Sequence, residues 1–172
     1  MLAKAAHGPE LSASGAVFSP CDNYRYGLWK IWQPDLPLLM FIGLNPSTAD
    51  ARQDDPTIRR CTGFARRWKY GGVLVANLFG FRATRPADLF ASPSPAGPDN
   101  KRWLANLSRR ADKVVAAWGN DGQRRLPADC LTAVNKPLYC LRQNLTGAPA
   151  HPLYIPATAR LRRFHMPPAR PG

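Results

Sequence analysis

The sequence has 172 residues, of which 45% are hydrophobic, which is enough for one well-buried domain and too little for two. Its 24 Lys and Arg outnumber 11 Asp and Glu, and most of these basic residues are arginine, so the net charge of +13 favours a polyanion, with nucleic acid as the leading partner. A membrane surface would be the competing partner, but no apolar stretch approaches the length of a spanning helix and no secretory apolar region opens the chain. We therefore expect a cytoplasmic monomer without membrane association.

The first part of the chain predicts a lead-in followed by two strands. Residues 1–15 lack periodicity and are expected to be flexible. Residues 24–32 alternate polar and apolar side chains, as an edge strand does, and residues 38–44 are continuously apolar, as in a strand buried on both faces. We expect the two strands to be neighbours. Pro46 ends the second strand, and Asn45 and Ser47 begin a polar turn beyond it.

A helix is predicted over residues 56–68, with Asp55 as N-cap and Pro56 in the first turn. Its apolar positions recur at intervals of three and four, which buries one face and leaves arginines on the other. Another buried strand covers residues 73–76 and ends at Asn77. The Pro-rich stretch 85–98 is too long for a simple connector and is a candidate binding lid.

The second half of the chain continues to alternate helices and strands. Helices are predicted over residues 99–110 and 123–134, strands over 113–119 and 137–141, and a short helix over 158–164. This alternation favours a three-layer α/β/α sandwich with a central, mainly parallel four-stranded sheet and an N-terminal edge strand or hairpin. We expect one domain over residues 16–164 and a basic tail over 165–172.

In such a sheet the carboxyl ends of the strands share one edge, where open α/β proteins carry their sites. Asn45, Asn77, Trp118 and the loop with His151 should therefore meet, although they are far apart in sequence. The cysteines form no Cys-x-x-Cys pair, so we expect reduced thiols, with neither a metal nor another cofactor.

Short motifs stand in a fixed order along the chain: LNPSTAD (44–50), DDPTIRR (54–60), NLF (77–79) with RAT (82–84), GP (97–98) with Asn100, WG (118–119) and HPLY (151–154). Over about residues 16–164 this series resembles an uncharacterised bacterial and phage family of unknown function. More remotely, it resembles the uracil-DNA glycosylase superfamily, particularly its mismatch-specific branch. There one strand ends in Gly-hydrophobic-Asn-Pro-Gly, a second ends in Asn followed by Arg-x-Thr, and a late loop carries His-Pro or Asn-Pro with a Leu.

The second resemblance implies a glycosylase-like fold and excision of uracil or of a damaged or modified base from a flipped nucleotide in single- or double-stranded DNA. It puts Asn45 at the position that orients the attacking water. Asn77 would read a pyrimidine edge, although an asparagine here can also cap a strand. His151 would donate a hydrogen bond to a base carbonyl, with a structural loop histidine as the alternative.

Other residues receive supporting roles. Leu153 or Tyr154 would wedge into the stack that the base leaves, or pack against the sheet instead. Phe64 would stack on the base, although its helical spacing favours the core. The remaining candidates for substrate binding are Pro46, Ser47, Arg82 and Trp118. Those for nucleic-acid binding are Arg59, Arg60, Arg160, Arg162 and Arg163.

The chain departs from the glycosylase pattern at Ser47, where a glycine is typical, and in the segment 51–60. The acidic residues Asp50, Asp54 and Asp55 either pair with Arg59 and Arg60 and cap the helix, bind a divalent ion, or supply a carboxylate that Asn45 lacks. Two alternatives to a glycosylase therefore stay open: a non-catalytic module that binds nucleic acid or a modified base, and a metal-dependent nucleotide hydrolase.

Overall fold

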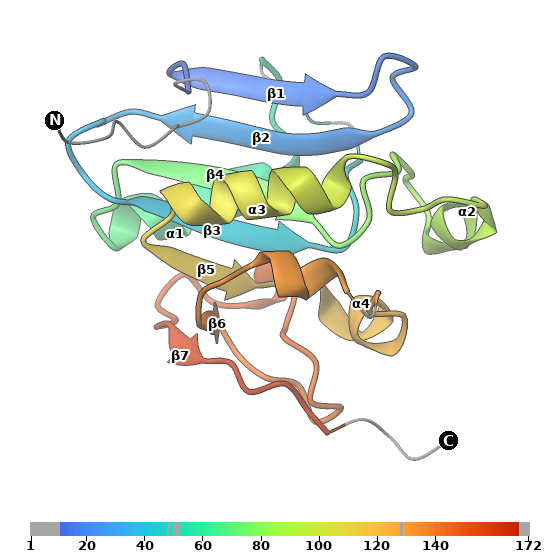
Figure 1. Cartoon of the computed structure of the whole chain (residues 1–172). Helices are drawn as coiled ribbons and strands as arrows, with labels where there is room; N and C mark the ends of the chain where they lie inside the picture. Colours follow the sequence, from blue (N-terminus) through green and yellow to red (C-terminus); the bar gives the residue numbers. More distant parts are fainter. Residues whose placement is uncertain (1–10, 48, 50–51, 128, 169–172) are drawn as a thin grey trace, which may run out of the picture.

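The computed structural model describes residues 11–47, 49, 52–127 and 129–168. The chain forms a mixed α/β domain around a seven-stranded sheet with the order β1-β2-β4-β3-β5-β6-β7 (Figure 1). The strands are β1 Ser14–Phe18, β2 Arg25–Ile31, β3 Leu38–Gly43, β4 Gly72–Asn77, β5 Lys113–Ala116, β6 Leu138–Cys140 and β7 Arg162–Arg163. The helices are α1 Pro56–Arg67, α2 Pro86–Ala91, α3 Asn100–Arg110 and α4 Gly119–Arg124, with 3₁₀ turns η1 Cys130–Ala133 and η2 Pro152–Tyr154.

The centre of the sheet is parallel, and its edges are antiparallel. Strand β3 pairs in parallel with both β4 and β5, and β5 pairs in parallel with β6. The sheet is larger than the four mainly parallel strands that we expected at its centre, because β1 and β2 add an antiparallel hairpin on one side and β7, which was not expected, adds antiparallel to β6 on the other. The N-terminal hairpin was one of the two forms that we expected.

The parallel strands bury both of their faces, as their continuous apolar runs predict. Met40 and Ile42 of β3 point into one core with α3, whereas Leu39 and Phe41 point into the other core with α1. Successive side chains of a strand point to opposite faces, so one strand supplies both cores. Figure 1 shows α3 across one face of the sheet and α1 on the other. Helices thus cover both faces.

Helix α1 begins where its capping signals predict. The Asp55 side chain accepts a hydrogen bond from the Ile58 backbone N–H, and Pro56 occupies the first turn. Its apolar stripe, predicted from the spacing, is buried at Ile58, Cys61, Phe64 and Ala65. Helix α3 also lies in its predicted range.

The outer strands differ from the sequence predictions. Strand β2 is not an edge strand and does not neighbour β3, because β1 covers one side of it and β4 pairs with the other. Its side chains from Arg25 to Trp29 are consequently buried. Strand β1 begins at Ser14, within the segment expected to be flexible, and residues 1–10 lie outside the described part.

Towards the C-terminus, the predicted helix over residues 158–164 is wrong. Arg162 and Arg163 instead form β7, opposite Cys140 and Tyr139 of β6. The helix expected over residues 123–134 is split into the end of α4 and the turn η1. No helix in the described ranges is long and apolar enough to cross a membrane.

Candidate functional site

A pocket of about 520 Å³ lies at the carboxyl ends of the parallel strands. Its wall includes Asn45 just beyond β3, Asn77 at the end of β4, Trp118 beyond β5 and His151 at the start of η2. In Figure 1 the arrowheads of β3 and β5 point to the same side of the sheet, where α2 and α4 lie. The structure thus brings together the four positions that the topology predicted at one edge. The volume of this pocket is in the range of small-molecule binding sites.

Asn45 has a fixed side-chain amide. Its Nδ2 donates hydrogen bonds to the carbonyls of Ala83 at 2.8 Å and Pro46 at 3.0 Å, with a longer contact to the carbonyl of Phe81 at 3.4 Å. Since these acceptors hold the NH₂ group, the orientation of the amide is set, and Oδ1 receives no hydrogen bond from a described residue. Asn45 therefore offers the pocket an oriented acceptor without a negative charge.

Asn77 is only 4% exposed, and its Nδ2 has no hydrogen-bond partner among the described residues. A buried donor left unpaired costs about 1–3 kcal/mol. Its amide lies against Gly43, where an added Cβ would be 2.8 Å from Asn77 Oδ1. The glycine at the end of β3 makes room for this side chain. Asn77 therefore lines the pocket, while its Nδ2 is an unpaired donor without accessible surface.

His151 acts as the N-cap of η2, because its Nδ1 accepts a hydrogen bond from the Leu153 backbone N–H at 3.2 Å. Nδ1 is then the unprotonated nitrogen, so Nε2 carries the proton of the neutral ring. Burial lowers the pKa of His151, and the negative charge of Asp55 opposes this shift. Near neutral pH the ring is a neutral donor through Nε2.

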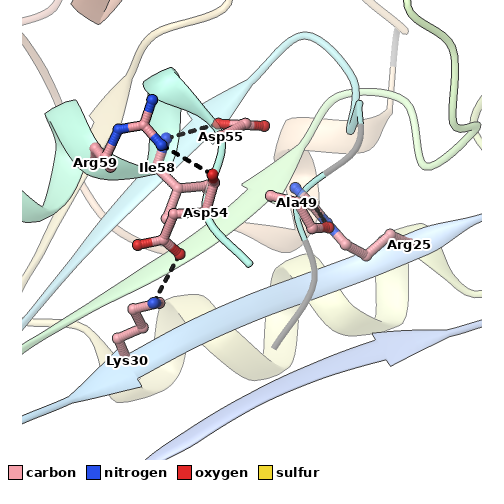
Figure 2. Close-up of polar contacts among 7 residues, drawn as sticks. All are labelled: Arg25, Lys30, Ala49, Asp54, Asp55, Ile58 and Arg59. Atoms are coloured by element: carbon pink, nitrogen blue, oxygen red, sulfur yellow. Dashed lines mark hydrogen bonds and ion pairs between the residues drawn. The ribbon is translucent and has the colours of Figure 1, made fainter. Parts of the chain in front are cut away.

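The side chains of Asp54 and Asp55 make contacts that stabilise the fold (Figure 2). Asp55 caps α1 with one oxygen and accepts the Ser47 hydroxyl at 3.0 Å with the other. Asp54 forms an ion pair with Lys30 at 2.7 Å, while Arg59 donates to the Asp54 backbone carbonyl. The expected pairing of these carboxylates with Arg59 and Arg60 is therefore wrong, and the capping role is confirmed.

Asp50, the third member of the predicted acidic cluster, lies outside the described residues. Within the described ranges, no three His, Cys, Asp or Glu side chains are grouped so that they could hold a metal ion. The four cysteines are free thiols, with Cys21 exposed and Cys61, Cys130 and Cys140 buried.

The outer wall of the pocket carries two exposed side chains from η2. Leu153 is 43% exposed and Tyr154 is 76% exposed, and both line the pocket. They do not pack against the sheet, which was the alternative to a wedge role. Trp118 is buried and donates its indole N–H to Gln123 Oε1, so its hydrogen-bonding group is already used.

Several predicted site residues lie away from the pocket. Phe64 belongs to the core beneath α1 and stacks on Trp68, with ring centroids 5.1 Å apart, as its helical spacing favoured. Arg82 donates to the Asp22 carbonyl and lies over Phe18. The predicted site residues that do not line the pocket are Pro46, Asp54, Phe64, Arg59, Arg60, Arg82, Arg160, Arg162 and Arg163.

Arg60 has a structural role that the sequence did not indicate. Its Nε donates to the Pro152 carbonyl at 3.4 Å, its Nη2 donates to the Ile155 carbonyl, and its guanidinium lies over the Phe64 ring. These bonds hold η2 against α1 and thereby fix the positions of His151 and Leu153. Arg60 is thus a positioning residue for this part of the pocket.

Sequence reasoning missed Arg25, which lines the pocket although it is only 2% exposed. Its Nη1 donates to the Ala49 carbonyl beyond β3 (Figure 2). A buried arginine needs partners, but the alternating polar and apolar pattern of residues 24–32, which also holds Lys30, carried no signal that marked Arg25 as the buried one. Arg25 anchors the chain that follows the Asn-Pro-Ser turn.

Together, the fold and the site define a mixed α/β protein with a ligand-sized pocket at the carboxyl ends of its parallel strands. Residues 25–153 match the family described as protein of unknown function (DUF1643), and the chain belongs to this family. The match runs from β2 into η2 and includes Asn45, Asn77 and His151. No curated protein and no solved structure matches the chain.

Proposed function

We propose that the protein is a DNA-base N-glycosylase, which removes uracil or a damaged or modified base from a flipped nucleotide. The observation that carries this proposal is the oriented Oδ1 of Asn45, an uncharged acceptor in a pocket that is also lined by the Asn77 amide and by His151, a donor through Nε2. The remote glycosylase resemblance of the motifs around these residues is the second support.

Asn45 suits the water that attacks the sugar. Its NH₂ group is held by backbone carbonyls, so Oδ1 can accept a hydrogen bond from that water and fix its direction. An amide barely deprotonates water, so the sugar must develop oxocarbenium character before the water adds. The proposed enzyme is therefore slow, with positioning as the contribution of Asn45.

Asn77 and His151 suit the departing base. When the N-glycosidic bond breaks, negative charge develops on the base, and hydrogen-bond donors that face its carbonyls stabilise that charge. Neutral His151 offers Nε2–H, and the buried, unpaired Nδ2 of Asn77 becomes a second donor when its amide turns towards the base. Two donors favour a base with carbonyl oxygens, such as a pyrimidine.

The surroundings of the pocket suit a nucleotide that has left a DNA stack. A volume of about 520 Å³ accommodates a flipped nucleotide, and exposed Leu153 and Tyr154 stand beside the opening, where they can replace the lost stacking. The net charge of +13 attracts the backbone. We propose that the protein acts as a monomer in the cytoplasm.

The test uses oligonucleotides that contain uracil or one of several modified bases, incubated with the protein and then treated with alkali to cleave abasic sites. We expect cleavage with at least one base, and a loss of roughly 100-fold or more in Asn45→Ala. Arg109→Gln, on the exposed side of α3, is the control and should retain the wild-type rate. Thermal unfolding of both variants checks that each is folded.

The proposal fails if the wild-type protein yields no abasic product with any base, or if Asn45→Ala cleaves as fast as the wild type. One observation favours the alternative of a non-catalytic binding module: the carboxylate of Asp55, which lines the pocket, is already occupied by Ser47 and Ile58. That alternative predicts salt-sensitive binding of DNA without any product.

A further inference from the structure

A row of outward-facing positions runs along α1, formed by Arg59, Gly63 and Arg67. Their spacing of four residues puts them on one side of the helix. They line a hollow of about 230 Å³ together with Arg60, Phe64 and Ala157. Among the described residues, three arginines and no acidic side chain line this hollow, so its electrostatic potential is positive.

This hollow continues towards the central pocket. A second hollow, of about 390 Å³, is lined by Pro56, Arg59, Arg60 and Leu153. It shares Arg59 and Arg60 with the first hollow and shares Leu153 with the pocket. The two hollows therefore form one surface path, here called the α1 groove, from the mouth of the pocket along α1.

The arginines of the α1 groove differ in what they can offer a ligand. Arg60 is bound to the carbonyls of Pro152 and Ile155. Arg59 is exposed and uses Nη1 on the Asp54 carbonyl (Figure 2), and its other N–H groups make no hydrogen bond with a described residue. Arg67 is exposed and makes no hydrogen bond or ion pair with a described residue. Arg59 and Arg67 are the available cations.

Gly63, between these two arginines, keeps the floor of the groove open. A Cβ at this position would meet nothing within 4 Å. Glycine lowers helix stability relative to alanine, so its place in the middle of α1 is a local cost. The absence of a side chain lets a ligand lie close to the helix backbone between two guanidinium groups.

We propose that the α1 groove binds the phosphodiester backbone of the DNA strand whose flipped nucleotide occupies the central pocket. This inference rests on the proposed function and specifies its substrate as a strand, not a free nucleotide. Guanidinium groups match phosphate oxygens in geometry as well as charge. Arg59 and Arg67 are roughly 12 Å apart along the helix axis, which spans roughly three phosphates at the rise of a helical strand.

The test measures fluorescence anisotropy of a labelled single-stranded DNA oligonucleotide over a series of salt concentrations. Each phosphate contact contributes about 0.7 to the slope of log affinity against log salt for a single strand. We expect Arg67→Gln to reduce the slope by about 0.7 and the Arg59→Gln, Arg67→Gln double variant by about 1.4. Gly63→Glu should weaken binding more than either single arginine variant, because it brings a negative charge between the two cations.

Arg109→Gln is the matched control, because it removes the same charge from α3 on the other face of the sheet and should leave the slope unchanged. Unchanged slopes in the groove variants, or an equal loss in Arg109→Gln, overturn the inference. The readout needs no base excision. If binding depends on the groove but no base is released, the glycosylase proposal fails and the groove stands. If bases are released while the groove variants bind like the wild type, the groove proposal alone fails.

Discussion

Two buried asparagines differ in how their side-chain amides are hydrogen-bonded. Asn100 is 2% exposed, and its Nδ2 donates to the carbonyls of Asn77 and Leu78 at 3.0 and 2.9 Å. Asn77 is nearly as buried, but its Nδ2 has no partner among the described residues. The first side chain holds α3 to the end of β4, whereas the second lines the pocket with its Nδ2 buried and unpaired.

We predict that replacing these asparagines by leucine has opposite effects on stability. Asn100→Leu leaves two buried carbonyls without their hydrogen-bond donor and should lower the free energy of unfolding by about 2 kcal/mol. Asn77→Leu removes an unpaired donor with a side chain of similar size and should leave that free energy unchanged or raise it by up to about 1 kcal/mol, while substrate binding is lost. Urea unfolding and DNA binding of both variants provide the comparison. An Asn77→Leu protein that is strongly destabilised would show that the amide has a structural partner.

His151 should make stability depend on pH on the acid side. Burial holds its folded-state pKa below the unfolded value of 6.5, so the unfolded chain takes up this proton first as pH falls. The contribution of the neutral ring is therefore complete above pH 6.5 and is lost as pH falls from 6.5 towards the lower folded pKa.

The variant His151→Asn isolates this titration, because Asn can accept the Leu153 N–H as an N-cap but does not ionise in this range. We predict that it flattens the dependence of unfolding free energy on pH below 6.5. An NMR titration of the wild-type ring should give a midpoint below 6.5 for His151. A variant whose stability follows the wild-type pH curve would rule out His151 as the source.

At this scale, sequence reasoning identified the meeting of Asn45, Asn77 and His151, because strand ends in a parallel sheet converge whatever their distance in the chain. It did not identify the bonds that orient Asn45, because one acceptor, the Ala83 carbonyl, belongs to a segment 38 residues away. Lys30, the partner of Asp54, was missed for the same reason.

Among the elements, helix α1 is made less stable by the glycine at position 63. We predict that Gly63→Ala raises the free energy of unfolding by about 0.5–1 kcal/mol, because alanine favours the helix and its Cβ meets nothing within 4 Å. The control is Gly122→Ala in α4, where the Cβ would be 2.7 Å from atoms of the fully buried Trp118. That variant should unfold at a lower temperature than the wild type. Thermal unfolding of the two variants should shift in opposite directions, and a shift in the same direction would contradict the packing described at Gly63.

Elements with a local signal were predictable, and those that depend on distant pairing were not. Helix α1 carries its cap, its proline and its apolar stripe within its own sequence. The sequence of β2 carries no local signal for its pairing partner, since β2 directly precedes β3 in the chain but pairs with β4. Likewise, Arg162 and Arg163 have no strand signal of their own and become β7 because they lie beside β6.

For the whole molecule, the cysteines report how completely the sheet is covered. Cys21 is exposed, and a hydrogen bond from Ser19 lowers its thiol pKa. Burial raises the thiol pKa of Cys61 and Cys140, and raises that of Cys130 to about 11. Thiolate reactivity follows exposure and pKa.

We predict that a thiol reagent labels Cys21 rapidly in the native protein and labels all four cysteines in denaturant. Mass spectrometry of the labelled protein counts the modified residues. A Cys21→Ser variant should show no fast phase. Fast labelling of Cys61 or Cys140 in the native state would mean that α1 or β6 opens much more readily than its packing implies.

The position of β2 between β1 and β4 also bears on synthesis of the chain. The β1–β2 hairpin is the first described part to leave the ribosome, yet its partner β4 follows only after roughly 40 more residues, which takes roughly 2–8 s at typical elongation rates. During that interval the side of β2 that will pair with β4 offers unpaired backbone N–H and C=O groups to other chains. The strand that ends inside the sheet is therefore the one most open to intermolecular pairing while the protein is being made.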